Sequence, residues 1–82
     1  MENQFFVGQA EFKTGHVLRK DLSFFKTGGE RAEIYEIFNS EIEAKDYAKN
    51  KNIENPEIEY WVENDNGKTI FYVSKNEIKE YD

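Results

Sequence analysis

The chain contains no cysteine, one proline and one histidine among its 82 residues. Without cysteine it forms neither disulfides nor thiolate metal sites. Small secreted domains usually depend on such links, so the composition predicts a cytoplasmic protein. No apolar run approaches the roughly 20 residues that a membrane-spanning helix needs, and the polar start Met1–Gln4 is unlike a signal peptide. We expect one domain over residues 1–82 and no contact with a membrane.

Groups that could perform catalysis are also scarce. The only histidine is His16, beside a predicted turn, and the only serines are Ser23, Ser40 and Ser74. A catalytic triad needs a nucleophile, a base and a group that orients the base, and this sequence lacks most of these residues. Carboxylates are abundant, but in so acidic a chain any two of them could be proposed as a general acid and a general base, so their presence indicates little. We expect no enzymatic activity and no catalytic or cofactor-binding residues.

The stretch Asn64–Gly67 resembles the start of a calcium-binding loop. In that motif the first acidic ligand would fall at the position of Val62, and no glutamate follows at the right distance. A hairpin turn accounts for the same residues. We therefore expect no metal site.

Basic residues are outnumbered: 11 lysines and arginines stand against 17 aspartates and glutamates, giving a net charge of −6. Binding to nucleic acid depends on neutralising phosphates with positive charge. This balance opposes a direct nucleic-acid partner.

Alternating apolar residues and turn signals predict five strands. Gly8 in the first indicates a bulge or a close approach by another part of the chain. The second is ambiguous, because Leu18 and Leu22 fit both a strand face and a helical stripe; its flanking turns favour the strand. The predicted strands are Gln4–Phe12, Val17–Phe25, Arg31–Phe38, Glu57–Asn64 and Lys68–Val73.

Ser40 followed by Glu43 is a capping box, which predicts that a helix begins there. Ala44, Tyr47 and Ala48 would form its narrow apolar face. The same spacing at Ser74 and Glu77 predicts that the tail ends in a short helical turn. The predicted fold is therefore α+β: an antiparallel sheet in the order strand-strand-strand-helix-strand-strand, with the helix packed on one face.

The two strands joined by Asn66-Gly67 carry the most informative pattern, because Asn-Gly is a strong hairpin signal. Alternation places Tyr60 and Val62 on one face and Trp61 on the other. One of the two faces has to meet the helix, and we expect Trp61 to lie on the face away from it, because glutamates share its face and resist burial. The first face is predicted to carry Ile58, Tyr60, Val62, Phe71 and Val73, and the second Glu57, Glu59, Trp61, Glu63, Ile70 and Tyr72.

Aromatic residues with a charged rim are typical of protein-protein contacts. We therefore predict a non-enzymatic binding module whose contact residues are those of the second face, with Trp61 as the anchor. The partner would be another protein or a second copy of the chain in a homodimer. The alternative is that Leu22, Phe24 or the tail covers this face as part of the core.

A second hypothesis rests on the acidic residues alone. Alternate residues of a strand lie about 6.6–6.8 Å apart, which matches two steps along one DNA strand. Glu57, Glu59 and Glu63, with Glu33 and Glu36 nearby in sequence, could therefore imitate phosphates. Under this hypothesis the chain is a phage or mobile-element inhibitor that blocks a nucleic-acid-binding or defence protein. Ordinary solvation of a strand face explains the same charges.

We expect that the chain has no intrinsic hydrolase, transferase or redox activity, because the nucleophile and base that such activity needs are missing. Panels of substrates from each class should give no turnover above a buffer control. The matched control is the His16→Ala variant. Turnover by the wild type that this variant loses would contradict the expectation.

Overall fold

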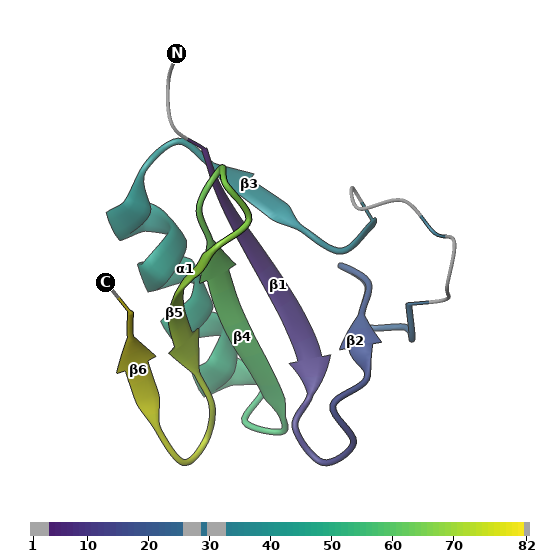
Figure 1. Ribbon diagram of the computed structural model, residues 1–82. Helices are drawn as coiled ribbons and strands as arrows, with labels where there is room; N and C mark the ends of the chain where they lie inside the picture. The colour runs from purple at the N-terminus through teal and green to yellow at the C-terminus, as the bar shows by residue number, and fades with distance from the viewer. Residues whose placement is uncertain (1–3, 26–28, 30–32, 82) are drawn as a thin grey trace.

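A computed structural model describes residues 4–25, 29 and 33–81 of the chain. Within these residues the chain forms one helix and six strands, arranged as a helical layer on an antiparallel sheet (Figure 1). This confirms the α+β class and the packing of the helix on the sheet. In chain order the elements are β1 (Phe5–Glu11), β2 (Val17–Leu18), β3 (Glu36–Phe38), α1 (Glu41–Glu54), β4 (Ile58–Glu63), β5 (Thr69–Val73) and β6 (Ile78–Glu80).

Strand β1 lies inside the sheet, whose strand order is β2-β1-β4-β5-β6. One edge of β1 pairs with β4, where Val7 opposes Val62 and Gly8 opposes Trp61. The other edge pairs first with β3 and then with β2. Because both of its edges are hydrogen-bonded, β1 fixes the positions of three other strands.

The helix begins where the capping box predicts. The Ser40 side chain accepts a hydrogen bond from the Glu43 N–H (3.3 Å), which satisfies one of the free donors of the first turn. Ala44 and Ala48 are completely buried against the sheet, since their small side chains let the helix approach it closely. In the part of the chain that the structure describes, no helix is long and apolar enough to cross a membrane.

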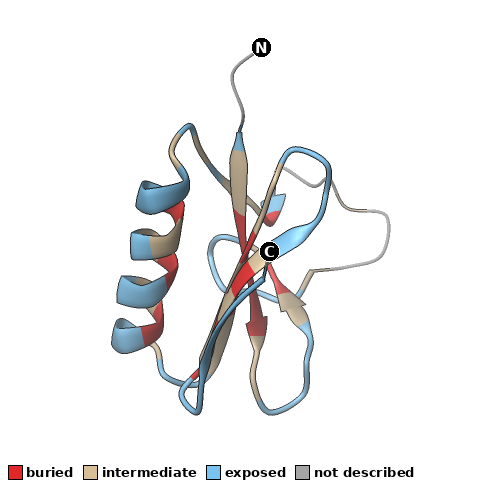
Figure 2. Ribbon diagram, turned by 60° about the vertical axis from the view of Figure 1, so that its left-hand side comes forward, coloured by how far each residue is buried: buried red, intermediate tan, exposed pale blue. Residues whose placement is uncertain are grey.

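The core lies between α1 and the strands β1, β4 and β5. Val7 and Val62 are fully buried at its centre, beside Tyr60 and Phe71. Figure 2 shows buried positions in red along the strands and on the side of α1 that faces the sheet. The predicted helix-facing set of Ile58, Tyr60, Val62, Phe71 and Val73 is confirmed.

The turn between β4 and β5 is built as Asn66-Gly67 predicts. The Gly67 N–H donates to the Asn64 carbonyl (3.0 Å), and the Asn64 N–H donates to the Lys68 carbonyl (2.9 Å). Gly67 has a φ of +81°, in the left-handed region that glycine tolerates best. The hydrogen bonds enclose Asp65, Asn66 and Gly67 as a three-residue loop with glycine in its left-handed position.

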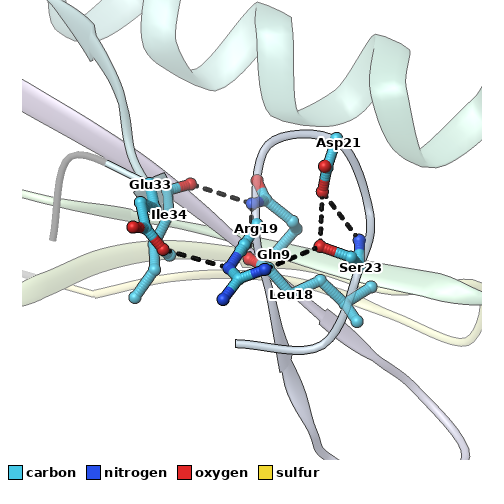
Figure 3. A network of polar contacts seen from close by, with 7 residues as sticks. All are labelled: Gln9, Leu18, Arg19, Asp21, Ser23, Glu33 and Ile34. Carbon is cyan, nitrogen blue, oxygen red and sulfur yellow. Dashed lines mark hydrogen bonds and ion pairs between the residues drawn. The ribbon is translucent and has the colours of Figure 1, made fainter. Parts of the chain in front are cut away.

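The predicted strand Val17–Phe25 is confirmed only at its start, because β2 ends at Leu18. A tight loop follows, in which the Arg19 N–H donates to the Ser23 carbonyl (2.7 Å). Asp21 explains the break: its Oδ1 accepts from the Ser23 N–H (2.9 Å) and hydroxyl (2.6 Å), as Figure 3 shows. Such an Asx turn competes with sheet pairing. The helical alternative is wrong for this stretch.

A buried amide ties this loop region to the sheet. Gln9 is 3% exposed, and its Nε2 donates to the carbonyls of Leu18 (2.7 Å) and Ile34 (2.8 Å) (Figure 3). The same figure shows the ion pair between Arg19 Nε and Glu33 Oε2 (3.0 Å). Because buried polar groups need partners, the Gln9 amide holds two segments distant in sequence against β1.

The predicted third strand, Arg31–Phe38, is shorter in the structure. Arg31 and Ala32 lie outside the described residues, and Glu33 and Ile34 form a turn. Pairing with β1 covers only β3. The turn is compatible with the carbonyl of Ile34 pointing at Gln9 rather than at a neighbouring strand.

The tail forms a strand, so the predicted helical turn after Ser74 is wrong. The Ser74 N–H donates to the Glu77 carbonyl (2.8 Å), and the Ser74 hydroxyl accepts from the Asn76 N–H (3.3 Å). These bonds close a hairpin that lays β6 against β5. A serine side chain that accepts a nearby N–H serves a turn as well as a helix cap, so the spacing alone does not distinguish them.

We expect that replacing Gly67 by valine lowers the free energy of unfolding by about 1 kcal/mol or more, because a β-branched residue resists positive φ. Gly67→Asn is the matched control, since asparagine enters the left-handed region more readily. Urea unfolding of both variants measures the difference. A valine variant with the wild-type midpoint would contradict the turn.

Candidate functional site: the open face of the sheet

The sheet has one face turned away from α1, which we call the open face. In Figure 2 the helix lies on one side of the sheet only. Register places Phe6 opposite Glu63 and Ile37, and Gly8 opposite Trp61, on this side. The residues that define the open face are Phe6, Tyr35, Ile37, Glu59, Trp61, Glu63 and Tyr72.

The Trp61 indole lies over Gly8 of the neighbouring strand. A Cβ atom added at Gly8 would stand 2.4 Å from Trp61 Cζ2 and 2.6 Å from Cε2. No other amino acid leaves room for the ring in this position. The close approach that Gly8 predicts is therefore made by an aromatic ring, across the β1–β4 pair.

A single carboxylate oxygen holds two of the rings. Glu63 Oε2 accepts from Trp61 Nε1 (2.7 Å) and from the Tyr35 hydroxyl (2.7 Å). Tyr35 meets Trp61 edge to face, with ring centroids 6.5 Å apart, and it meets Phe6 in the same way at 6.0 Å. Edge-to-face contacts are favourable between aromatic rings. The rings of Phe6, Tyr35 and Trp61 are thus fixed relative to one another.

A second carboxylate holds the remaining ring. The Tyr72 hydroxyl donates to Glu59 Oε2 (2.6 Å), and both side chains are half-buried. Burial, and after it the hydrogen bond to Glu59, raise the pKa of the Tyr72 phenol. The phenol therefore remains a hydrogen-bond donor at neutral pH. Tyr72 opposes Trp61 in the β4–β5 pair, so the two rings are neighbours on the open face.

Two predicted contact residues lie elsewhere. Glu57 precedes β4, and its carboxylate forms an ion pair with Lys75 (3.1 Å), whose ammonium also lies over the Phe12 ring. Glu57 therefore does not share the hydrogen-bonded cluster of Glu59 and Glu63.

Ile70 packs against the core on the helix side, so its predicted place beside Trp61 is wrong. The cause is a β-bulge: Val62 opposes Phe71, but Glu63 opposes Thr69, which leaves Ile70 as the extra residue. Strict alternation assumes an unbroken register, and a bulge reverses the side for the residues beyond it.

Phe6, Tyr35 and Ile37 belong to the open face but were not among the predicted contact residues. Alternation along their own strands places Tyr35 and Ile37 on one side. Local patterns in the sequence do not reveal that β3 pairs with one edge of β1 while β4 pairs with the other. Only that long-range pairing brings Tyr35 within reach of Trp61.

Groups suited to chemistry are dispersed over the described residues. None of their His, Asp and Glu side chains form a group of three or more that could hold a metal ion. The His16 ring packs against Phe24, with centroids 5.0 Å apart. An open depression of about 300 Å³ lies between the start of α1 and the β4–β5 turn, lined by Phe5, Glu41, Asn64, Asp65, Asn66 and Ile70.

No family model, characterised protein or solved structure matches this chain.

We expect Gly8→Ala to lower the free energy of unfolding by about 1–3 kcal/mol, as overpacking does, because the new methyl group occupies the place of the indole. The double variant Gly8→Ala/Trp61→Ala is the control. Once the ring is absent, alanine at position 8 should cost much less. Denaturant unfolding of both single variants, the double variant and the wild type completes the cycle. Purely additive effects would contradict the contact.

Proposed function

We propose that the chain is a non-enzymatic binding module that contacts another protein through the open face. The observation that carries the proposal is the hydrogen-bonded set of rings and carboxylates on that face. Trp61 and Tyr35 are held by Glu63, and Tyr72 is held by Glu59. Side chains that are already ordered lose little entropy when a partner binds, so the face is preorganised for contact.

Its composition supports the same function. Trp61 and Tyr72 are half-buried, while Ile37 on the same face is 53% exposed. Tryptophan and tyrosine dominate the energy of many protein interfaces, because each buries a large area with few rotatable bonds. A partner seated here would cover apolar surface that the described helix leaves open.

Charge mimicry is the second candidate, and it has less support. Glu59 and Glu63 keep their carboxylates on one strand, as the hypothesis requires. Glu57 is neutralised by Lys75, however, and Glu33 by Arg19. An acidic inhibitor would therefore present a shorter row of charge than the sequence suggests. For either function, the lack of cysteine favours action in the cytoplasm.

The proposal is tested with a partner captured by the tagged chain from its native cells and then purified. Calorimetry measures its affinity for the wild type and for the variants Trp61→Ala, Tyr72→Ala and Ile53→Ala. Ile53 is 75% exposed on α1 and serves as the control for loss of an exposed apolar side chain. We expect the first two changes to weaken binding about tenfold or more, and Ile53→Ala to leave it unchanged.

Thermal unfolding of each variant separates loss of contact from loss of fold. Trp61→Ala removes packing on Gly8, so Tyr72→Ala provides the second measurement on the same face. Binding that survives both changes but fails in Ile53→Ala would contradict the proposal and move the contact to the helix.

A further inference from the structure

The open face also indicates the chemistry of its partner. This inference rests on the proposed function and deepens it. We propose that the partner presents an arginine side chain, whose guanidinium pairs with the Glu59 carboxylate and packs on the rings of Tyr72 and Trp61.

Glu59 differs from most other carboxylates of the described chain. Its Oε2 accepts one hydrogen bond, from the neutral hydroxyl of Tyr72, and no ion pair to it is present among the described residues. Many exposed carboxylates, by contrast, already have a cation nearby. Those pairs are Glu33 with Arg19, Glu41 and Glu80 with Lys45, Asp46 with Lys49, Glu54 with Lys51, Glu57 with Lys75, and Glu77 with Lys79.

A half-buried carboxylate with one neutral donor retains unused acceptor capacity. Partial burial makes its charge harder for water to solvate, so a cation that replaces the lost water binds favourably. The bond from Tyr72 fixes the carboxylate in one orientation before any partner arrives. Glu59 is therefore the position on the open face where a positive group is most strongly favoured.

The surrounding rings select arginine over lysine. Trp61 lies two residues from Glu59 on the same strand, and Tyr72 opposes Trp61 on the next. A guanidinium is planar, so it can lie on an aromatic ring while its edge donates two hydrogen bonds to a carboxylate. An ammonium group has no such plane and keeps more of its hydration.

Charge also favours a different protein over a second copy of this chain. A two-fold dimer through the open face would bring equivalent surfaces together, and with them the Glu59 carboxylates of the two copies. Like charges in a partly buried contact repel. A second copy would have to supply the arginine from Arg19 or Arg31. Arg19 is engaged by Glu33 and lies in the loop after β2, and Arg31 lies outside the described residues. The net charge of −6 further speeds the encounter with a basic partner.

The experiment uses a short capped peptide of alternating arginine and glycine as the probe. Two comparison peptides carry lysine or the neutral analogue citrulline in place of arginine. Each is titrated into the labelled chain and followed by NMR at the indole N–H signal, which is unique because the chain has one tryptophan. Glu59→Gln removes the charge but keeps an acceptor for Tyr72. Glu54→Gln on α1 removes the same charge away from the open face.

We expect the arginine peptide to shift the indole signal and to bind several-fold more tightly than the lysine peptide. Glu59→Gln should weaken binding about tenfold, as loss of a charge-assisted bond does, and Glu54→Gln should change it by less than about twofold. Equal effects of the two charge changes, equal affinity for both basic peptides, or no binding of the arginine peptide would each overturn the inference.

The native partner separates this inference from the proposed function. If Trp61→Ala weakens binding of that partner and Glu59→Gln does not, the open face binds the partner without a contact between an arginine and Glu59. If sedimentation shows a wild-type dimer that Trp61→Ala dissociates, the occupant is a second copy and the inference is wrong.

Discussion

Trp61 can lie over β1 only because Gly8, directly opposite, has no side chain. That contact constrains the rest of the molecule. A shift of one residue between β1 and β4 would turn Trp61 toward the helix and expose Val62, which is now fully buried. The same register directs the indole N–H to Glu63 and brings Tyr35 against the ring. The fit of one ring to one glycine thus aligns the core and the open face together.

Carboxylates have different partners on the two sides of the sheet. Around the helix and the outer strand, carboxylates meet lysines in exposed pairs such as Glu41 with Lys45, which contribute little to stability. On the open face, Glu59 and Glu63 are held by the neutral donors of Tyr72, Trp61 and Tyr35. The neutral Tyr72 hydroxyl orders the Glu59 carboxylate without cancelling its charge. The described structure therefore contains a surface that combines ordered rings with ordered negative charge.

Local signals predicted much of this fold. Asn66-Gly67 specified a hairpin with positive φ at the glycine, and Ser40 with Glu43 specified the start of α1. Those features depend on residues a few positions apart, which sequence spacing reports directly. The helix-facing residues of β4 and β5 followed from the alternation between Tyr60 and Val62.

What the sequence did not reveal depends on pairing between distant segments. The bulge that moves Ile70 to the helix side is a mismatch between two strands, not a property of either strand. The loop after β2 is stabilised by Asp21 and by the amide of Gln9 from another strand. Tyr35 joins the open face only because β3 pairs with β1. The candidate site was therefore predicted at Trp61, Tyr72, Glu59 and Glu63, and its β1 and β3 side was not.

Hydroxyl-radical footprinting of the chain, alone and with its purified partner, tests most directly whether the open face is the binding surface. Oxidation is measured at individual side chains by mass spectrometry. Binding at the open face predicts that Trp61 and Tyr72 become protected in the complex, while Ile53 on α1 and Tyr81 after β6 keep their reactivity. Protection of Ile53 or Tyr81 with unchanged oxidation of Trp61 and Tyr72 would contradict the account.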